Sequence, residues 1–240
     1  MEKPLNGRVA VVSGATHGLG ESVARHLGSL GADVVILARG QEALDSTAAN
    51  LESAGVRALS ISCDASDSAQ VQQAADKILE EISGVDILVN NVGVPAPTSF
   101  QETAVSDWDY IIGVNLSSAF YLTRALWDSL AGGQGAYVVN IAGTAGLRGG
   151  GSPSYAATKF GLTGLTRAIA SAGKDHNVRA TVLYPGSMDT GWRGAPIGVR
   201  PPSETMDPDE VARYIGYLVT TPAEFVINEA VLNPLADPFM

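Results

Sequence analysis

The sequence lacks the features that mark disulfide-rich, membrane and metal-binding proteins. Its single cysteine, Cys63, cannot form an intrachain disulfide and lies away from any second thiol or histidine pair, which fits a reducing compartment and offers no metal site. No apolar run approaches the ~18 residues of a membrane span, and no signal-like segment fits before the first predicted strand. We therefore expect a cytoplasmic protein with no membrane partner.

Positive charge is also scarce. The chain has 15 lysines and arginines against 25 aspartates and glutamates, which gives a formal net charge of −10. This excess would repel the phosphate backbone of DNA or RNA, and no run of Lys or Arg offsets it locally. Nucleic acid is therefore not an expected partner.

What the sequence does contain is a regular alternation of short β-branched runs with helical stretches. The chain is 240 residues long and 45% hydrophobic, enough for one sizeable core, so we expect a single domain over residues 1–240. The alternation predicts a three-layer doubly wound α/β fold of the Rossmann type, with a mainly parallel seven-stranded sheet. The predicted strands are residues 8–13, 33–38, 56–62, 87–90, 136–141, 178–183 and 226–232.

Two helices are well defined by their sequence. Residues 71–82 place apolar side chains at helical spacing, which predicts one stripe for packing on the sheet. The stripe consists of Val71, Ala74, Ala75, Ile78, Leu79 and Ile82. A second helix is expected to start at Asp207, because Asp207 is a capping residue and Pro208 suits the first helical position.

The segment between Gly186 and Met206 has no periodicity and many glycines and prolines, which is typical of a mobile loop over a site. Together with the glycines at 149–151 it is expected to line a substrate pocket. Met188, Leu147 and Trp192 suggest an apolar wall for that pocket. Arg193 is a candidate contact for an acidic group.

A glycine-rich turn follows the first predicted strand and precedes a helix. In that context glycines let the backbone approach a pyrophosphate, which binds the free N–H groups at the positive end of the helix. Gly14, Gly18, Leu19 and Gly20 are therefore assigned to a coenzyme site. The spacing is Gly-x3-Gly-x-Gly, and a turn needed only for close helix packing is the alternative.

The end of the second strand indicates which nucleotide binds. Ala38 and Arg39 stand where NAD-binding sites commonly place an acid, so no carboxylate accepts the ribose 2′-hydroxyl and Arg39 can pair with a 2′-phosphate. NADP(H) is therefore expected in preference to NAD(H). His17 lies in the turn and either assists the phosphate when protonated or is an exposed histidine without a role.

These features and four further segments resemble the short-chain dehydrogenases/reductases over essentially the whole chain. Cys63-Asp64-Ala65 resembles the family's adenine-contacting segment, and Asn90-Asn91-Val92-Gly93 resembles its Asn-Asn-Ala-Gly turn, with Val92 in place of alanine. Asn115 matches the helix asparagine of the catalytic tetrad. Tyr155-Ala-Ala-Thr-Lys159 matches Tyr-x3-Lys.

The resemblance implies further site residues and an assembly. Asp64, Ala65, Asn91 and Gly93 would contact the coenzyme, Lys159 would hold the nicotinamide ribose, and Asn115 would support a water-linked proton path. Downstream, the resemblance adds the coenzyme residues Pro185, Gly186, Met188 and Thr190. Members of the family are usually dimers or tetramers, so a homodimer or homotetramer is expected, with residues 106–131 and 225–240 as candidate contact segments.

The chemistry of Tyr155 and Lys159 follows from their spacing. Residues four apart at the start of a helix project from one face and are neighbours in space. A free phenol has a pKa of ~10, and an adjacent ammonium lowers that pKa by stabilising the phenolate. Tyr155 is therefore expected to exchange a proton with a substrate oxygen while hydride moves to or from a nicotinamide.

One family residue is missing. The family places a serine after the fifth strand, where this chain reads Asn140-Ile141-Ala142-Gly143-Thr144-Ala145-Gly146. Alignment on Ile141 and Gly146 puts Gly143 at the position of the family's serine. Counting the family's common thirteen-residue separation back from Tyr155 gives Ala142 instead, and neither residue has a hydroxyl. Thr144 is the nearest substitute, with Ser152 and Ser154 further away. Alternatively, Thr144 only bonds its own backbone in the turn.

Two functions therefore remain open from sequence. The first is an NADP(H)-preferring oxidoreductase that reduces a ketone or aldehyde, or oxidises the alcohol, with a small-molecule substrate. The second is a nucleotide-binding protein without redox turnover that acts through partner contacts, because loss of a donor to the reacting oxygen costs roughly 10²–10³ in rate.

Overall fold

A single sheet organises the computed structural model, which describes residues 3–97, 99–133, 135–149 and 152–237. Within these residues seven strands, all parallel, follow the order β3-β2-β1-β4-β5-β6-β7, which confirms the predicted sheet. The strands are β1 (Val9–Ser13), β2 (Asp33–Ala38), β3 (Ala58–Ser62), β4 (Ile87–Asn90), β5 (Ala136–Ile141), β6 (Val178–Pro185) and β7 (Glu229–Leu232).

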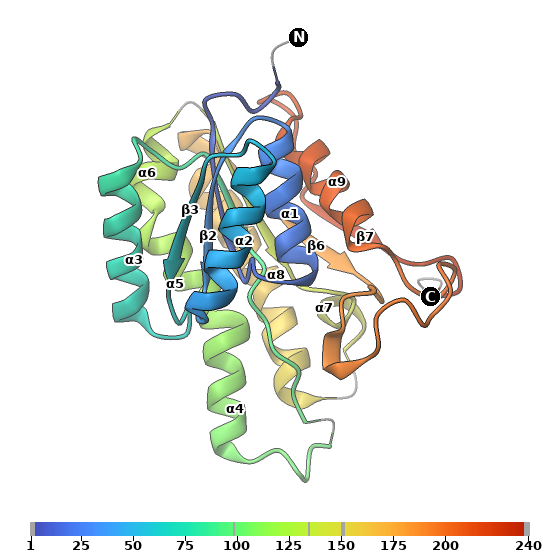
Figure 1. Ribbon diagram of the computed structural model, residues 1–240. Coiled ribbons are helices and arrows are strands. Elements are labelled where there is room, and N and C mark those ends of the chain that lie inside the picture. The colour runs from blue at the N-terminus through green and yellow to red at the C-terminus, as the bar shows by residue number, and fades with distance from the viewer. Residues whose placement is uncertain (1–2, 98, 134, 150–151, 238–240) are drawn as a thin grey trace.

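Helices lie in two layers, one on each face of the sheet (Figure 1). The apolar sides of α1, α2 and α9 pack on one face, and those of α3, α5, α6 and α8 pack on the other. The helices are α1 (Gly18–Ser29), α2 (Gln41–Ser53), α3 (Ser68–Glu81), α4 (Val105–Ile112), α5 (Ser118–Ala125), α6 (Trp127–Gly132), α7 (Ala145–Arg148), α8 (Pro153–Gly173) and α9 (Pro208–Val219). Because both faces are covered, every residue of β1, β4 and β5 is buried.

The two helices expected from their sequence form where predicted. In α3 the residues Val71, Ala74, Ala75 and Ile78 are buried. The predicted stripe is wrong at Leu79, which is 42% exposed because it turns past the face that meets the sheet. Asp207 caps α9 by accepting a hydrogen bond from the Asp209 N–H at 2.8 Å, and Pro208 is the first helical residue.

Four strand ends differ from the predicted ones. Strand β1 begins at Val9 instead of residue 8. Val56 belongs to the turn after α2, since its N–H donates to the Leu51 carbonyl, so β3 starts only at Ala58. Strand β6 continues to Pro185, because its partner β7 continues to Leu232 beside it. Strand β7 begins at Glu229 instead of residue 226.

The topology places a crevice at the carboxyl edge of the sheet. The chain moves outward from β1 through β2 to β3, and then crosses back to β4 on the other side of β1. The loops after β1 and β4 therefore diverge to opposite faces, and an open α/β sheet binds its ligands at such a point.

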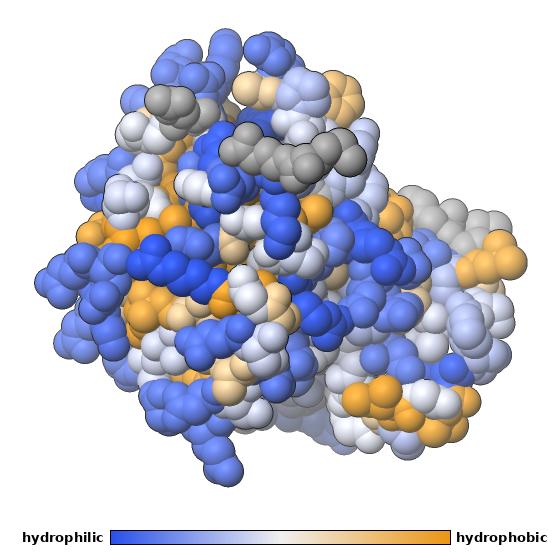
Figure 2. Space-filling view, turned by 45° about the horizontal axis from the view of Figure 1, so that its top comes forward, coloured by the Kyte–Doolittle hydropathy of each residue, from blue (hydrophilic) through white to orange (hydrophobic). Residues whose placement is uncertain are grey.

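The face of the molecule in Figure 2 is largely hydrophilic, with its hydrophobic residues in separate patches. None of the helices in the described ranges is both long and apolar enough to cross a membrane. In the predicted contact segment 106–131, Trp108, Tyr110 and Phe120 are 39%, 47% and 50% exposed. The homodimer or homotetramer stays a prediction.

Candidate active site

A groove of about 1110 Å³ lies at the switch between β1 and β4. Its volume exceeds the ~300–1,000 Å³ of most small-ligand pockets, which leaves room for a dinucleotide together with a small substrate. The groove collects nearly all predicted coenzyme residues, from the ends of five strands and from helix α8. They are Gly14, His17, Gly18, Leu19, Arg39, Asp64, Ala65, Asn91, Gly93, Tyr155, Lys159, Pro185, Gly186, Met188 and Thr190.

Gly20 is the predicted coenzyme residue that does not line the groove. A Cβ on Gly20 would collide with the Gly14 carbonyl oxygen and would lie 2.6 Å from Asn91 Nδ2. Gly20 is therefore required for close packing of α1 against the turn. Gly14 and Gly18, in contrast, line the groove and have φ values of +64° and +56°, a left-handed backbone that favours glycine. Close helix packing thus accounts for Gly20, whereas the coenzyme role of Gly14 and Gly18 stays a prediction.

Asn91 joins the two strand ends that flank the crevice. Its Nδ2 donates to the Ser13 and Gly14 carbonyls at 3.2 and 3.1 Å, and its backbone N–H donates to Ser13 Oγ at 3.1 Å. The side chain therefore holds the glycine turn in place, so its part in a coenzyme site is to position Gly14.

One end of the groove lies beyond β2 and β3 and carries Arg39 and Asp64. Oδ1 of Asp64 accepts hydrogen bonds from the Ser66 N–H at 2.9 Å and from Ser66 Oγ at 2.7 Å, while Oδ2 makes none to the described residues. Arg39 and His17 line the same groove, and no acidic residue stands at 38–40.

Tyr155 and Lys159 lie on the first turns of α8, which Ser152 begins by accepting a hydrogen bond from the Tyr155 N–H at 3.3 Å. Lys159 Nζ lies 5.5 Å from the centroid of the Tyr155 ring and donates to the Ile141 carbonyl at 2.9 Å. Its side chain is only 4% exposed, and this burial lowers the pKa of Lys159 to about 8. The predicted phenol–ammonium pair is thus present in the groove.

Asn115 lies behind the groove wall. It belongs to a π-helical segment, Gly113–Ser117, between α4 and α5. Its Oδ1 accepts from the Val94 N–H at 2.7 Å and its Nδ2 donates to the Val94 carbonyl at 2.9 Å. Val94 lines the groove, so the Asn115 side chain fixes the backbone that follows β4.

No hydroxyl occupies the position of the missing serine. Gly143 and Ala142 line the groove, and Gly143 has a φ of +76°. Thr144 does not line it. The Thr144 hydroxyl has no hydrogen bond within the described residues, whereas its backbone N–H donates to the Pro185 carbonyl at 3.2 Å. Ser152 and Ser154 are buried beside each other at 3.4 Å and do not reach the groove either.

The segment after β6 crosses the groove. A Cβ on Gly18 would lie 3.0 Å from Thr190 Cβ, and a Cβ on Gly93 would lie 3.7 Å from both Trp192 Cη2 and Lys159 Nζ. The Trp192 and Tyr155 ring centroids are 6.4 Å apart. Met188 pairs with Met206, which closes the base of this segment. The segment therefore covers the groove where Tyr155 and Lys159 lie.

Of the residues predicted to line the substrate pocket, some lie in the groove and others do not. Met188 and Trp192 line the groove, but Leu147 packs with Ala142 and Leu162 instead. Gly149 lies against the Phe160 ring, and residues 150–151 and the Arg193 side chain lie outside the described part of the chain. Ser187 and Arg200 also line the groove, and neither was predicted from the sequence. Ser187 follows Pro185-Gly186 directly, which is a usable signal, whereas nothing in the sequence distinguishes Arg200.

Comparisons with known proteins identify the family of the chain. A family model described as short chain dehydrogenase matches residues 8–195. The 3-oxoacyl-[acyl-carrier-protein] reductase of Synechocystis sp. is 29% identical over 95% of this chain and 96% of its own length. An alcohol dehydrogenase from Thermococcus sibiricus, complexed with 5-hydroxy-NADP, superposes with a TM-score of 0.91 at 27% identity, covering 97% of this chain and 99% of its own. A metagenomic short-chain oxidoreductase in complex with NADP is 32% identical with a TM-score of 0.84, covering 96% and 98%.

Proposed function

The chain belongs to the short-chain dehydrogenase family, and from this membership we propose that it is an NADP(H)-preferring oxidoreductase that reduces a ketone or aldehyde or oxidises the alcohol. The observation that supports this most directly is the pairing of Tyr155 with the buried ammonium of Lys159 inside the groove. An oxidoreductase of CH–OH and C=O groups needs such a proton donor beside its coenzyme.

The residues of the groove fit a nicotinamide dinucleotide phosphate. Gly14 and Gly18 leave open backbone at the start of α1, where the N–H groups and the helix dipole favour a pyrophosphate. Arg39 and Lys159 both line the groove, and in this proposal Arg39 pairs with the 2′-phosphate and Lys159 holds a ribose hydroxyl. NADPH, when bound, supplies the hydride.

In the reducing direction, Tyr155 donates its phenolic proton to the carbonyl oxygen, so that the carbonyl gains one hydride and one proton and becomes an alcohol. Lys159 stabilises the phenolate that this step leaves behind. Asn115 holds the Val94 backbone at the groove wall, and Trp192 covers Tyr155 and limits access of water.

Gly143 offers no hydroxyl to the reacting oxygen, and the geometry does not bring Thr144 to the groove in its place. We therefore propose that Tyr155 is the main hydrogen-bond donor to that oxygen. A nucleotide-binding protein without turnover is the second candidate, and the missing hydroxyl is the observation that favours it.

A panel of ketones and aldehydes, followed by the loss of NADPH absorbance, tests the proposal. Turnover of one or more substrates is expected, and Tyr155→Phe is expected to reduce kcat by about 10³-fold or more while the Kd for NADPH changes little. Tight NADPH binding with no turnover across the panel would favour the second candidate. Undiminished turnover by Tyr155→Phe would remove Tyr155 from the mechanism.

A further inference from the structure

One cation in the groove is not used by the proposed coenzyme site. The groove is lined by Arg39, Lys159 and Arg200, in a protein whose formal net charge is −10. Arg39 follows β2, and Ser187, which Arg200 contacts, follows β6. Strands β1, β4 and β5 separate β2 from β6 in the sheet, so Arg200 and Arg39 lie toward opposite ends of the groove.

Arg200 is oriented by a hydroxyl of the groove wall. Its Nη1 donates to Ser187 Oγ at 2.7 Å, and this is its one hydrogen bond to the described residues. A guanidinium carries five N–H donors, so four remain available in a planar fork that matches a carboxylate or phosphate. The Ser187 oxygen accepts from Arg200, and its own proton is therefore free to be donated.

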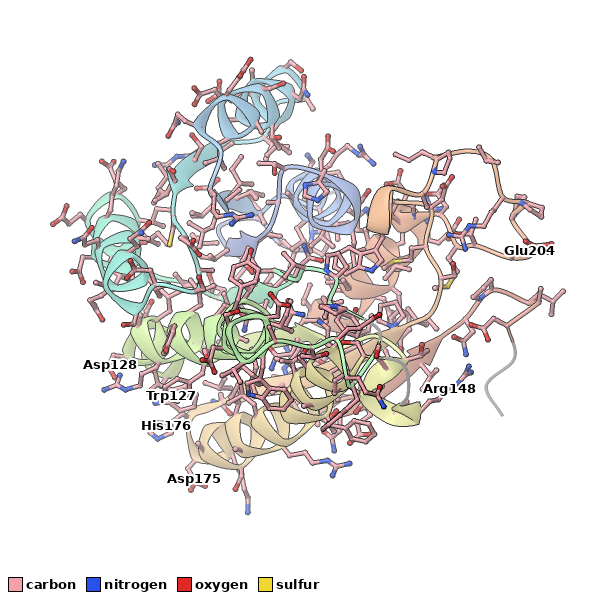
Figure 3. All side chains as sticks on the ribbon, turned by 90° about the horizontal axis from the view of Figure 1, so that it is seen from below. Trp127, Asp128, Arg148, Asp175, His176 and Glu204 are labelled. Atoms are coloured by element: carbon pink, nitrogen blue, oxygen red, sulfur yellow. The ribbon has the colours of Figure 1, made fainter. Side chains whose placement is uncertain are left out.

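No acid of the described residues neutralises Arg200. The ion pairs within the described ranges involve other cations, and the acid that lines the groove, Asp64, follows β3 at the opposite end. Asp189 lies in the same segment, but its Oδ2 accepts a hydrogen bond from the Gly198 N–H at 2.8 Å and it does not line the groove. Figure 3 shows this segment, which also carries Glu204, on the side of the molecule opposite Trp127 and His176.

We propose that Arg200 and Ser187 form an anion subsite for the substrate, so that the preferred carbonyl substrates carry a carboxylate or phosphate group. This inference rests on the proposed function, because it names the substrate class of the same groove. Trp192 over Tyr155 supplies an apolar surface for the body of the substrate, and Arg200 with Ser187 supplies the polar contact for its anionic end.

Matched pairs of carbonyl compounds test the subsite. The pairs are acetoacetate with methyl acetoacetate, levulinate with methyl levulinate, and dihydroxyacetone phosphate with dihydroxyacetone. In at least one pair we expect a higher kcat/KM for the anion than for its neutral counterpart. A response in the acetoacetate or levulinate pair indicates a carboxylate subsite, and a response in the dihydroxyacetone phosphate pair indicates a phosphate subsite. Arg200→Gln should lower that anion-to-neutral ratio by about tenfold, mainly through KM, and leave the KM for NADPH unchanged.

Arg57→Gln is the matched control, because Arg57 is exposed, pairs with Asp33 at the amino end of β2 and lies away from the groove. It should leave the ratio unchanged. An unchanged anion-to-neutral ratio in Arg200→Gln would overturn the subsite and leave Arg200 a structural role in the segment 186–206. A KM for NADPH that rises equally with every substrate would overturn it too, and would assign Arg200 to coenzyme binding.

Binding measurements keep the subsite testable apart from turnover. Calorimetric titration of levulinate and of dihydroxyacetone phosphate into the NADPH complex should show binding. We expect that binding to be about tenfold weaker in Arg200→Gln and to weaken further with added salt. If no carbonyl turns over but this binding is seen, the proposed reaction fails and the anion subsite stands. If neither anion binds, the subsite is refuted.

Discussion

At the scale of single residues, Arg39 is the proposed partner of the 2′-phosphate at the adenosine end of the coenzyme. It lines the groove at the end of β2, and residues 38–40 contain no carboxylate to accept two ribose hydroxyls. A guanidinium beside a phosphate makes charge-assisted hydrogen bonds that NADH cannot make.

The wild-type protein is therefore expected to bind NADPH about tenfold or more tightly than NADH, and Arg39→Ala is expected to abolish most of this difference by weakening NADPH alone. Titration of coenzyme fluorescence measures both dissociation constants, with Arg57→Ala as the surface control. Equal affinities for the two coenzymes in the wild type would show that Arg39 does not meet the 2′-phosphate.

The motif residues were predictable because each has a chemical reason tied to its position in the chain. Gly14, Gly18, Tyr155 and Lys159 all reach the groove as expected. The detailed role of Asn91 was not predictable, because its bonds to Ser13 and Gly14 depend on which strand lies beside β1. Thr144 was also not predictable. In the sequence its hydroxyl is close to the position of the missing serine, but the backbone geometry keeps it away from the groove wall.

At the scale of elements, α8 carries the proposed chemistry and packs closely on the segment that holds Asn115. A Cβ on Gly161 would lie 2.7 Å from Leu116 Cδ2, whereas a Cβ on Gly164, in the same helix, would meet nothing within 4 Å. These two glycines therefore offer a matched pair of substitutions.

Gly164→Ala is expected to stabilise the protein by about 1 kcal/mol, because alanine loses less backbone entropy than glycine in a helix. Gly161→Ala is expected to destabilise it and to lower kcat, because the Leu116 side chain or α8 itself must shift to admit the added methyl group. Thermal unfolding and steady-state kinetics measure both effects. Equal behaviour of the two variants would contradict the close approach of α8 to this segment.

Elements with a strong period were found from sequence with small errors at their ends, as α3 and α9 show. The segment 186–206 was recognised as a loop over the site, but its contacts come from residues distant in the chain. Thr190 lies over Gly18 and Trp192 lies near Gly93. No local pattern encodes such contacts, which is also why Arg200 was missed.

At the scale of the whole molecule, burial of the Lys159 ammonium reduces stability. Below pH 8 the folded protein holds this charge away from water, and its pKa is lowered to about 8 from the ~10.4 of an exposed lysine. Between these values the unfolded chain binds more protons than the folded one, so the contribution of Lys159 to the free energy of unfolding rises with pH.

The coenzyme-free wild type should therefore gain about 2 kcal/mol of stability relative to Lys159→Met between pH 7 and pH 9.5. Urea unfolding of both proteins at the two pH values measures the difference. Burial raises the pKa of Cys63 to about 11, but that group is common to both proteins and cancels. A pH-independent difference would mean that Lys159 stays hydrated in the folded state.

The passage of Thr190 over Gly18 and of Trp192 beside Gly93 has a kinetic consequence. In the proposed site, a dinucleotide against the strand ends would lie beneath this covering segment, and a carbonyl compound would enter between the dinucleotide and the segment. We therefore predict a compulsory order of binding, in which the nucleotide arrives first and departs last. We predict that lifting of the covering segment limits the turnover number, so loosening that motion should speed the catalyst more than altering the proton donor would.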